Sequence, residues 1–538
     1  MFDFAKKIFL MLLGGALCSA YTAAQSSSIE WKDYDYIKNS DARLTGYNAS
    51  GLKHLSVDRI ASANIFANKQ NGKFINYHQS DDSYTLGAQT ESFLRLSPKI
   101  VFYGKISYDN FTGKNMGGSA FINPYYNPFD IVEYSDSTRG KKNLETYHLT
   151  GAASADLTER LTIGGKIDYT AANYAKQKDL RHKNKMLDLY ATAGLTYRIN
   201  TLIEAGASYY YRRSVEGLKF DMYGTTEKQY FSLINYGAFF GKTEMFGSDG
   251  YTDKDNEKPM FNEFHGASLS LDININPEMH FFNEITYKLR DGEYGRRSAR
   301  DIVYSEHNSD IIEYNGSISY KKGENHHLLN INFENETLEN FENIYRLETR
   351  PGGSSQIVYF DQLKVADKER LSAKASYTAY LGIKDYCPTW ILKGGAAFQQ
   401  NKLTASLYPF YRKQTIQFTD YNIFAARNIV NGKNMYTFSI DAHYISGGGT
   451  KNKDGEYATP GDSQTRPRYT DFNLNNEYEC LTTDQIKACI GIKYSKQLDK
   501  TGIRGYAALN YSLTKAFEVK HLPDDNSSSI SLSLGCVF

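Results

Sequence analysis

The stretch MLDLYATAGLTYRIN, residues 186–200, alternates apolar and polar side chains from Leu187 to Ile199. The apolar row starts at Leu187, and the other row contains Asp188 and Arg198. Such alternation is the pattern of a β-strand whose two faces meet different surroundings. Strands in soluble sheets average about 5–6 residues, whereas a tilted strand that crosses a bacterial outer membrane needs about 9–11. The stretch therefore predicts a membrane-crossing strand.

The same alternation recurs along the chain. It is clear in ASLSLDININ (267–276), LSAKASYTAYLGI (371–383) and MYTFSIDAHYI (435–445), and a further run covers 58–78. Weaker runs begin near Thr85, Ile100, Glu145, Leu161, Leu202, Met279, Ile311, His326, Thr389, Tyr469, Ile486, Ile503 and Ser528. Together they predict an all-β fold, a single antiparallel up-and-down barrel of about 18 strands, with 14 and 16 as alternatives.

The connections between these runs differ in length. Short ones include 97–99 and 276–278, whereas 112–143, 217–265 and 339–369 are long and polar. Short periplasmic turns and long extracellular loops are typical of membrane barrels. A large soluble β-protein, the alternative, would have shorter strands and no such asymmetry.

One region does not fit this scheme. KLTASLYPFYRKQTIQF (402–418) offers one more strand, and the polar stretch 447–468 has the composition of an outer loop. The strand count nevertheless places 447–468 on the side of the short turns. The sequence leaves this conflict open.

The N-terminal stretch has the order of a secretory signal peptide. Lys6 and Lys7 precede an apolar run over 8–17, and small residues follow. An apolar run of this length is too short to span a bilayer as a helix. We predict a signal peptide over 1–24, cleaved before Gln25, and therefore export.

Residues 25–57 separate this signal from the barrel, which we predict over 58–538. The segment contains Trp31, Tyr34 and Ile37, which give it apolar surface to bury. We therefore expect it to enter the barrel lumen rather than remain a disordered leader.

Composition excludes some classes of protein. The chain has 62 basic and 61 acidic residues, a net charge of +1 and a mean hydropathy of -0.54. Nucleic-acid binders usually carry a basic excess or a basic stripe, so nucleic acid is not an expected partner. No later stretch has the roughly 18 consecutive apolar residues of a helical membrane span.

In a membrane barrel the apolar row faces lipid, because polar groups there would lose their hydrogen bonds. The polar row then faces the lumen, as a path for hydrophilic solutes or as a lumen closed by ion pairs and the N-terminal segment. The residues predicted to line the lumen are Lys105, Asp109, His148, Lys166, Asp168, Arg198, Glu204, Arg212, Asp272, Glu284, Lys288, Arg290, Lys374, Lys393, Asp441, His443, Asp471, Glu477, Glu479, Lys487, Lys493 and Arg504.

Three stretches carry a family resemblance. YNASGL (47–52), FYGKISYDN (102–110) and ISLSLGCVF (530–538) resemble an uncharacterised, porin-like family of outer-membrane β-barrels of the Bacteroidota. The resemblance implies an outer-membrane location and no particular activity. It also implies that the terminal Phe538 is read by the barrel-assembly machinery, although Ser533 stands where the usual signal has glycine.

The polar lumen rows lead to a functional prediction: a channel or transport-associated barrel for small hydrophilic solutes, embedded in outer-membrane lipid. A TonB-dependent transporter or a surface lipoprotein is a predicted partner, and the chain is too short to be such a transporter itself. YNASGL is also similar to a stretch of long-chain fatty-acid transporter barrels, so a barrel for hydrophobic compounds is one alternative. A non-conducting binding or scaffold barrel is the other.

Chemical motifs are few. Asp253, Asp255 and Glu257 place three carboxylates in one loop, but a calcium loop also has a central glycine and a distal glutamate. A solvated loop is favoured over a metal site. The chain has no G-x-S-x-G motif, and no serine can be matched to His148 or His443. We predict neither an enzyme nor a cofactor.

Cysteines and aromatic residues have structural interpretations. Cys480 and Cys489 fall on opposite faces if both lie in strands, so no disulfide is expected between them. Two groups of tyrosines, Tyr209 to Tyr211 and Tyr125 with Tyr126, are candidates for an interfacial aromatic girdle. The long-loop aromatics Phe239, Phe240, Phe246 and Tyr251 are expected to pack within their loop.

Overall fold

The computed structural model describes residues 31–134, 136–225, 227–246, 250–296, 301–349, 353, 355–467, 469, 471–498 and 502–538. The predicted signal peptide, 1–24, lies outside these residues. None of the described helices is long and apolar enough to cross a membrane.

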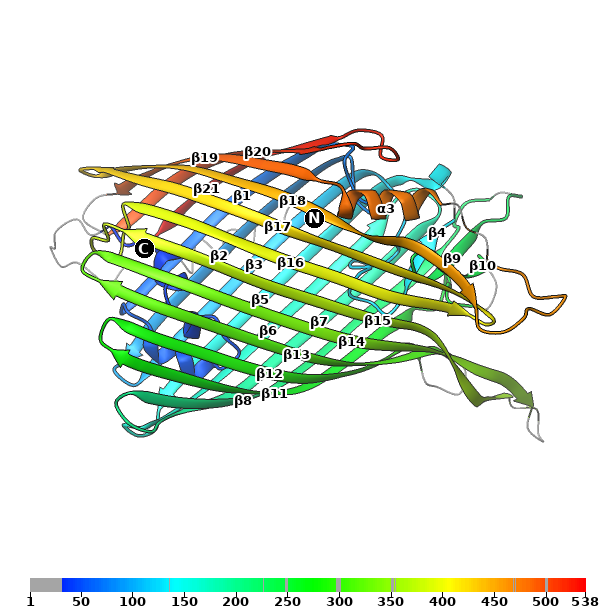
Figure 1. The fold of residues 1–538 in the computed structure, drawn as a ribbon, viewed down its shortest axis with the longest axis horizontal. Helices are drawn as coiled ribbons and strands as arrows, with labels where there is room; N and C mark the ends of the chain where they lie inside the picture. The colour runs from blue at the N-terminus through cyan, green and yellow to red at the C-terminus, as the bar shows by residue number, and fades with distance from the viewer. Residues whose placement is uncertain are drawn as a thin grey trace.

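Within the described residues, eighteen antiparallel strands form one closed sheet (Figure 1), and each pairs with its neighbours in chain order. The predicted barrel is therefore confirmed. Its strands are β1 (Arg59–Gly72), β2 (Asp82–Ser97), β3 (Ile100–Met116), β5 (Gly140–Asp156), β6 (Leu161–Lys176), β7 (Arg181–Arg198), β8 (Ile203–Asp221), β11 (Lys258–Asn276), β12 (Met279–Gly295), β13 (Val303–Lys322), β14 (Asn325–Thr349), β15 (Ser355–Leu381), β16 (Trp390–Leu407), β17 (Phe410–Asn431), β18 (Asn434–Glu456), β19 (Gln485–Leu498), β20 (Ile503–Ala516) and β21 (Asn526–Val537).

The last strand closes the barrel against the first. β1 and β21 are antiparallel, with Ser62 opposite Val537. The backbone N–H of Phe538 donates to the Ala61 carbonyl at 2.9 Å, and the Ala61 N–H donates back at 2.7 Å. Leu532 of β21 points outward and is exposed. The chain thus ends inside a paired strand whose apolar row faces outward, where a membrane would cover it.

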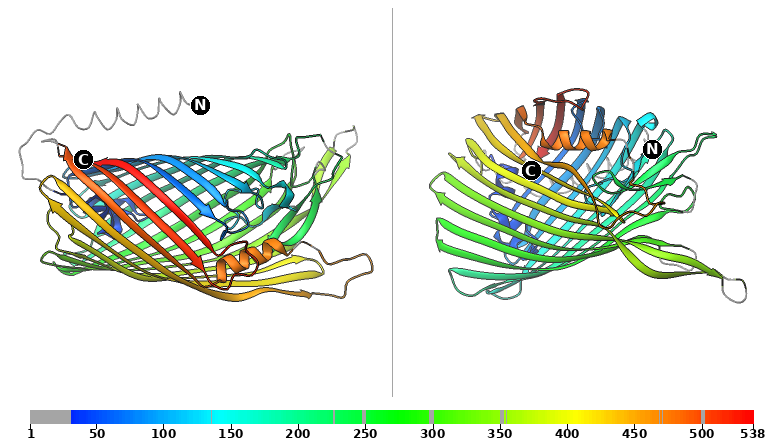
Figure 2. Two further views of the ribbon diagram at one scale, coloured as in Figure 1. Left: turned by 90° about the horizontal axis from the view of Figure 1, so that it is seen from above. Right: turned by 45° about the vertical axis from the view of Figure 1, so that its right-hand side comes forward.

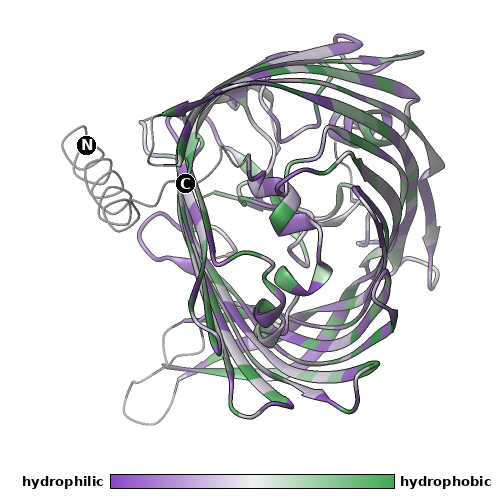
Figure 3. Cartoon of the chain, turned by 90° about the vertical axis from the view of Figure 1, so that its left-hand side faces the viewer, coloured by the Kyte–Doolittle hydropathy of each residue, from purple (hydrophilic) through white to green (hydrophobic). Residues whose placement is uncertain are grey.

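The outward rows of the other strands are apolar in the same way. Ile167, Leu269, Ile285, Ile423 and Ile490 are all more than half exposed. Their sequence neighbours point inward, so apolar and polar residues alternate along the ribbons in Figure 3. The exterior is suited to lipid, since isolated apolar side chains of this size otherwise favour burial.

The strand count agrees with the prediction, but one member differs. The run near Tyr469 is not a strand: helix α3 (Phe472–Thr482) lies there, and Leu474 and Glu477, one turn apart, are both buried. The missing strand is β17, which follows β16 through a tight turn at Tyr408 and Pro409. With β17 counted, the polar stretch after β18 falls on the side of the long loops, which removes the conflict.

The two ends of the barrel are built differently (Figure 2). At the end where Phe538 lies, strands are joined mainly by short turns, such as 277–278 and 323–324; we call this the turn end. At the opposite end, the loop end, long connections carry α3, η4 (Asp136–Thr138) and a small sheet of β4 (Asp130–Glu133), β9 (Phe231–Gly237) and β10 (Phe240–Met245).

One predicted long loop is instead regular structure. Residues 339–369 belong mostly to β14 and β15, whose paired ends project beyond the barrel at the lower right of Figure 1. Irregular register between Asn340 and Phe341, and again between Ile344 and Tyr345, interrupts the pairing there. Such bulges break the alternation in the sequence, which is why the pattern there was not recognised as strand.

Candidate functional site in the barrel lumen

Residues 31–57 of the predicted N-terminal segment lie inside the barrel at the turn end (Figure 3). They form three short helices, α2 (Tyr34–Asn39), η2 (Ala42–Leu44) and η3 (Ala49–His54). The side chains of Asp33, Asp41 and Asn48 accept hydrogen bonds from the backbone at the start of these helices. Such caps satisfy N–H groups that would otherwise lack partners.

Apolar packing anchors both ends of this segment. Ile37 is fully buried, and the Tyr36 ring meets Tyr380 of β15 edge-on at 4.8 Å between centroids. Leu52 and Leu55 are buried in the same cluster, against the wall of the barrel. The middle of the segment, residues 39–48, connects the two anchors; we call it the crossing.

Wall glycines make room for η3. A Cβ atom at Gly164 of β6 would lie 2.2 Å from the Ser50 nitrogen. A Cβ atom at Gly194 of β7 would lie 2.4 Å from Oδ1 of Asn48. In a strand, glycine often marks a place where another backbone approaches closely. The wall is therefore shaped to receive this segment.

Ion pairs hold the crossing. Arg43 donates from Nε and Nη2 to Asp41, at 2.9 and 2.6 Å, and also donates to Asp272 of β11. We call Asp41, Arg43 and Asp272 the latch. The Arg43 guanidinium holds the pKa of Asp41 well below its usual range, against the opposing effect of burial. The latch thus joins the crossing to the wall through charge-assisted hydrogen bonds, which are stronger than neutral ones.

A second group of charges adjoins the latch. Lys53 lies 2.8 Å from Glu204, and His54 lies 3.4 Å from the same carboxylate oxygen. Donor atoms of His54, Glu204 and Asp272 lie within 4.8 Å of one another, a spacing that could hold a metal ion. Because Lys53 and Arg43 already pair with these carboxylates, the group fits an ion-pair network better than a metal centre.

The loop carboxylates considered for calcium have local partners. Asp253 accepts backbone N–H groups of Asp255 and Asn256 at 2.8 and 2.9 Å, and the Asn256 amide at 3.0 Å. These contacts stabilise the turn, and they explain why the pKa of Asp253 is lowered despite burial. Asp255 and Glu257 lie in the same turn.

Two cavities lie on either side of the crossing. One, of about 620 Å³, is bounded by the crossing, by β12–β17 and by Lys166 and Tyr190 of the opposite wall. The other, of about 430 Å³, opens among the turns of β8 and β11–β14. Asp41, Ala42 and Leu328 line both. We call the larger cavity the chamber; the crossing separates it from the turn end.

The predicted lumen residues on strands lie on inward rows, and many are paired. Four of them, Lys166, Glu284, Lys374 and Lys393, line the chamber. Lys105 and Asp109 share the inner row of β3 with the buried Val101. Inner-wall ion pairs, with their distances, are His148–Asp168 (2.7 Å), Arg198–Glu204 (3.0 Å), Arg212–Asp188 (2.6 Å), Lys288–Glu313, Arg290–Glu336 (3.0 Å), His443–Asp420 (2.9 Å) and His443–Asp441 (3.3 Å).

Three predicted lumen residues are elsewhere. Asp471 precedes α3, and Glu477 and Glu479 lie on it, at the loop end and not on a strand of the wall. The carboxylate of Glu479 accepts the backbone N–H groups of His521 and Leu522 at 2.6 and 3.0 Å. Their assignment to a strand was wrong because periodicity over so few residues does not distinguish a strand from a short helix. Cys480 is likewise on α3, and its sulfur is free, as is that of Cys489.

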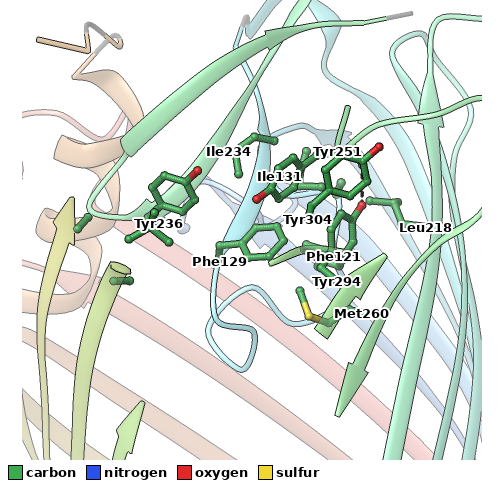
Figure 4. Packing of buried hydrophobic residues seen from close by; sticks show 14 of the residues in the cluster. Phe121, Phe129, Ile131, Leu218, Ile234, Tyr236, Tyr251, Met260, Tyr294 and Tyr304 are labelled. Atoms are coloured by element: carbon green, nitrogen blue, oxygen red, sulfur yellow. Dashed lines mark hydrogen bonds between the residues drawn. The ribbon is translucent and has the colours of Figure 1, made fainter. Parts of the chain in front are cut away.

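An apolar cluster, which no local pattern of the sequence indicated as a unit, packs the connections at the loop end together (Figure 4). Phe129 packs edge-on against Tyr251 and Tyr294, with centroids 5.3 and 5.2 Å apart. Ile234 of β9 and Tyr304 of β13 belong to the same cluster. We call these packed loops, with β4, β9, β10 and α3, the cap.

The long-loop aromatics are packed as predicted, whereas Tyr125 and Tyr126 do not lie where the girdle prediction placed them. Phe239, Phe240 and Tyr251 are buried in the cap, as loop packing predicted. Tyr125 lies inside the cap too, where its hydroxyl donates to Glu477 at 2.9 Å. Tyr126 stacks on Phe264. Neither tyrosine belongs to a lipid-facing girdle, because the loop that carries them folds inward.

The cap contains buried carboxyl groups. Asp130 accepts hydrogen bonds from Ser119 at 2.6 Å and Tyr77 at 3.0 Å, and burial raises its pKa to about 6. Burial likewise raises the pKa of Glu477, on α3, to about 7. Each carboxyl group therefore changes charge near neutral pH inside the cap.

Fold and site together define a class: a β-barrel with a lipid-suited exterior and a polar lumen, obstructed by an inserted segment at one end and by folded loops at the other. More particularly, the chain belongs to the family of unknown function DUF6850, whose family model matches residues 49–538. No curated protein matches the sequence.

Solved barrels resemble the fold distantly. The siderophore receptor PiuA from Acinetobacter baumannii is 12% identical, with a TM-score of 0.42 over 90% of this chain and 82% of that one. The toluene transporter TbuX from Ralstonia pickettii is 9% identical, with a TM-score of 0.28 over 93% of each chain. The CymD monoaromatic hydrocarbon channel is 8% identical, with a TM-score of 0.30 over 95% and 94%. Overlaps this distant specify neither substrate nor mechanism for this chain.

Proposed function

We propose that the protein is an outer-membrane channel or transport-associated barrel for small hydrophilic solutes, with the crossing as its gate. The observation that carries the proposal is the division of one polar lumen into two cavities, of about 620 and 430 Å³, by the crossing. Movement of residues 39–48 would join them into one path. The turn end would face the periplasm, as short turns do in outer-membrane barrels.

The construction of the segment supports a gate rather than a permanent seal. Its two ends are held by apolar packing around Ile37 and Leu52, whereas Asp41 and Arg43 of the crossing are held by the latch; farther along the crossing, Leu44 joins the apolar cluster and Tyr47 packs edge-on against Tyr210. Water and solute ions can replace polar contacts, but nothing in an aqueous lumen replaces apolar packing. Release of the latch can therefore let residues 39–43 move while the apolar contacts stay in place.

A carrier of hydrophobic compounds, the first alternative, would need an apolar pocket in the lumen. The chamber is instead lined by Lys374, Lys393 and several asparagines. The apolar cluster of the cap is filled by its own side chains, among them Phe129 and Tyr294. We therefore favour hydrophilic solutes.

A TonB-dependent transporter or surface lipoprotein stays a proposed partner, for which the projecting β14–β15 hairpin is the most accessible contact region.

Planar-bilayer recording of full-length protein tests the gate. Arg43→Ala leaves Asp41 and Asp272 without their shared partner, and a hydrogen bond to a charged group contributes about 1.5–3 kcal/mol. We expect the open probability of Arg43→Ala to rise at least about tenfold over wild type, since 1.4 kcal/mol corresponds to a factor of about ten.

Arg346→Ala is the matched control. Arg346 also pairs with a carboxylate, Glu348, but it is 64% exposed on the projecting hairpin, away from the lumen. It should leave the current unchanged. Absence of current in both wild type and Arg43→Ala, with folded barrels in both samples, would contradict the channel and favour the non-conducting scaffold.

A further inference from the structure

We infer that the chamber selects small organic anions that also carry hydroxyl groups, such as sugar acids. The inference names the solute class for the proposed function and rests on it only in treating the chamber as part of the solute path. It is argued from the balance of charges in the chamber, from the positions of two lysines and from the neutral side chains between them.

The carboxylates that line the chamber lie near positive groups, whereas two of its lysines have no carboxylate partner in the described part of the chain. Of its two carboxylates, Asp41 is already paired with Arg43 in the latch. The other, Glu284, lies near both Lys166 and Lys288. Lys374 and Lys393 have no carboxylate partner among the contacts of the described residues. The chamber therefore carries an excess of positive charge, although the chain as a whole is nearly neutral.

Lys374 and Lys393 lie along one wall. They are on neighbouring strands, and Lys393 is opposite Thr378, four residues from Lys374 along β15. Because a strand rises about 3.3 Å per residue, the two lysines are separated by roughly 13 Å along the strands. Arg370 continues the same inner row of β15 toward the cap. Glu334 of β14, on the inner row opposite Ser372, lies between Lys374 and Arg370, so the positive wall that faces the chamber itself is formed by Lys374 and Lys393.

Neutral hydrogen-bonding groups complete the wall. Asn315, Asn330 and Asn332 of β13 and β14 line the chamber beside the lysines. Amide side chains both donate and accept, which suits hydroxyl groups on a solute. A volume of about 620 Å³ falls within the usual range of ligand sites. The lysines would bind a carboxylate and the asparagines the hydroxyl groups.

Equilibrium binding to full-length protein in detergent tests the inference with two probes, D-glucuronate and D-glucose. Both have the same pyranose ring with its hydroxyl groups, and glucuronate has a carboxylate where glucose has a hydroxymethyl group. We expect wild type, or Arg43→Ala if the crossing limits access, to bind glucuronate at least about tenfold more tightly than glucose, which corresponds to about 1.4 kcal/mol. Lys374→Gln with Lys393→Gln should reduce this ratio to about one.

Lys496→Gln is the control, because Lys496 is an exposed lysine on the outward row of β19. It should keep the wild-type ratio. Equal affinity for the two sugars, no binding of glucuronate in either background, or a ratio unchanged in the double variant would each overturn the inference. Because binding needs no current, these results are independent of the bilayer test, whose failure would overturn the gate instead.

Discussion

The crossing at the turn end and the cap at the loop end both obstruct the lumen, but different forces hold them. The first part of the crossing is held by Arg43 and its two carboxylates, next to cavities that contain polar groups, and Leu44 and Tyr47 add apolar packing farther along it. The cap is held by aromatic packing around Phe129 and Tyr251, which are fully buried.

The difference indicates which obstruction can move. Apolar burial stabilises by roughly 25 cal/mol per Å² and has no substitute in an aqueous lumen. Ion pairs beside cavities that can hold water can exchange their partners for water molecules, an exchange that apolar packing does not have. We therefore expect the crossing to open more readily than the cap. The following experiments test that comparison, from the largest expected effect to the smallest.

Truncating the centre of the cap should have the largest effect. Phe129→Ala removes a fully buried ring that contacts Phe121, Tyr251 and Tyr294. We expect the cap to lose about 3–5 kcal/mol of stability, because the ring leaves a cavity. Hydrogen exchange of β9 would measure the loss. Phe360→Ala, at a half-exposed ring on the projecting hairpin, should change little. Unaltered exchange in Phe129→Ala would refute an apolar cap.

Raising the pH should weaken the cap. The pKa of Glu477 is raised to about 7, so the folded cap holds a proton that the unfolded chain releases near its ordinary pKa of about 4.3. That stability is present below about pH 4.3 and is lost as the pH rises through 7, to the extent of roughly 2–3 kcal/mol. Exchange of α3, corrected for intrinsic rates, should be faster at pH 8 than at pH 5.

Glu477→Gln is the control for this titration, since an amide keeps an acceptor for Tyr125 and does not ionise. It should reduce the pH dependence of α3 exchange; the remainder would come from Asp130, whose pKa is about 6.

The stability of the crossing should change with pH in the opposite direction. Because the pKa of Asp41 is lowered, its contribution is present above about pH 3.9 and declines in more acidic solution.

A methyl group on the receiving wall should displace η3 and leave the barrel intact. At Gly164 the new Cβ would meet the backbone of Ala49 and Ser50, at 2.4 and 2.2 Å. Overpacking of this kind costs about 1–3 kcal/mol. Trypsin should then cleave Gly164→Ala after Lys53 faster than wild type. Gly151→Ala is matched, because nothing lies within 4 Å of a Cβ there. Equal cleavage of both variants would mean that the wall does not hold η3.

The smallest effect is expected for an exposed ion pair. Lys364 lies 2.6 Å from Glu339, with both side chains about half exposed. Lys364→Ala should change thermal stability by no more than about 1 kcal/mol, since water screens such pairs. A larger loss would show that ion pairs outside the lumen matter as much as the latch, and the comparison would fail.

The strand pattern of the barrel could be read from the chain, because lipid on one side and water on the other impose a period of two on every strand. Leu187 with Asp188 and Ile440 with Asp441 already show which residue faces which way. The same alternation predicted which residues face the lumen, among them Lys374 and Lys393 of the chamber. The pattern was misleading near Tyr469, where a short helix follows. It was incomplete at β17, which follows β16 after a turn of two residues.

Only the tertiary structure decided which side chains contact the residues of the inner rows. That Arg43 reaches Asp272, 229 residues away, or that Gly164 leaves space for Ser50, follows from the closure of the barrel and not from any local pattern. The cap is likewise assembled from several connections, each too short to have its own core. Alternation records whether a side chain faces lipid or lumen, whereas its partner across the lumen depends on strand register and on the inserted segment, which no local periodicity encodes.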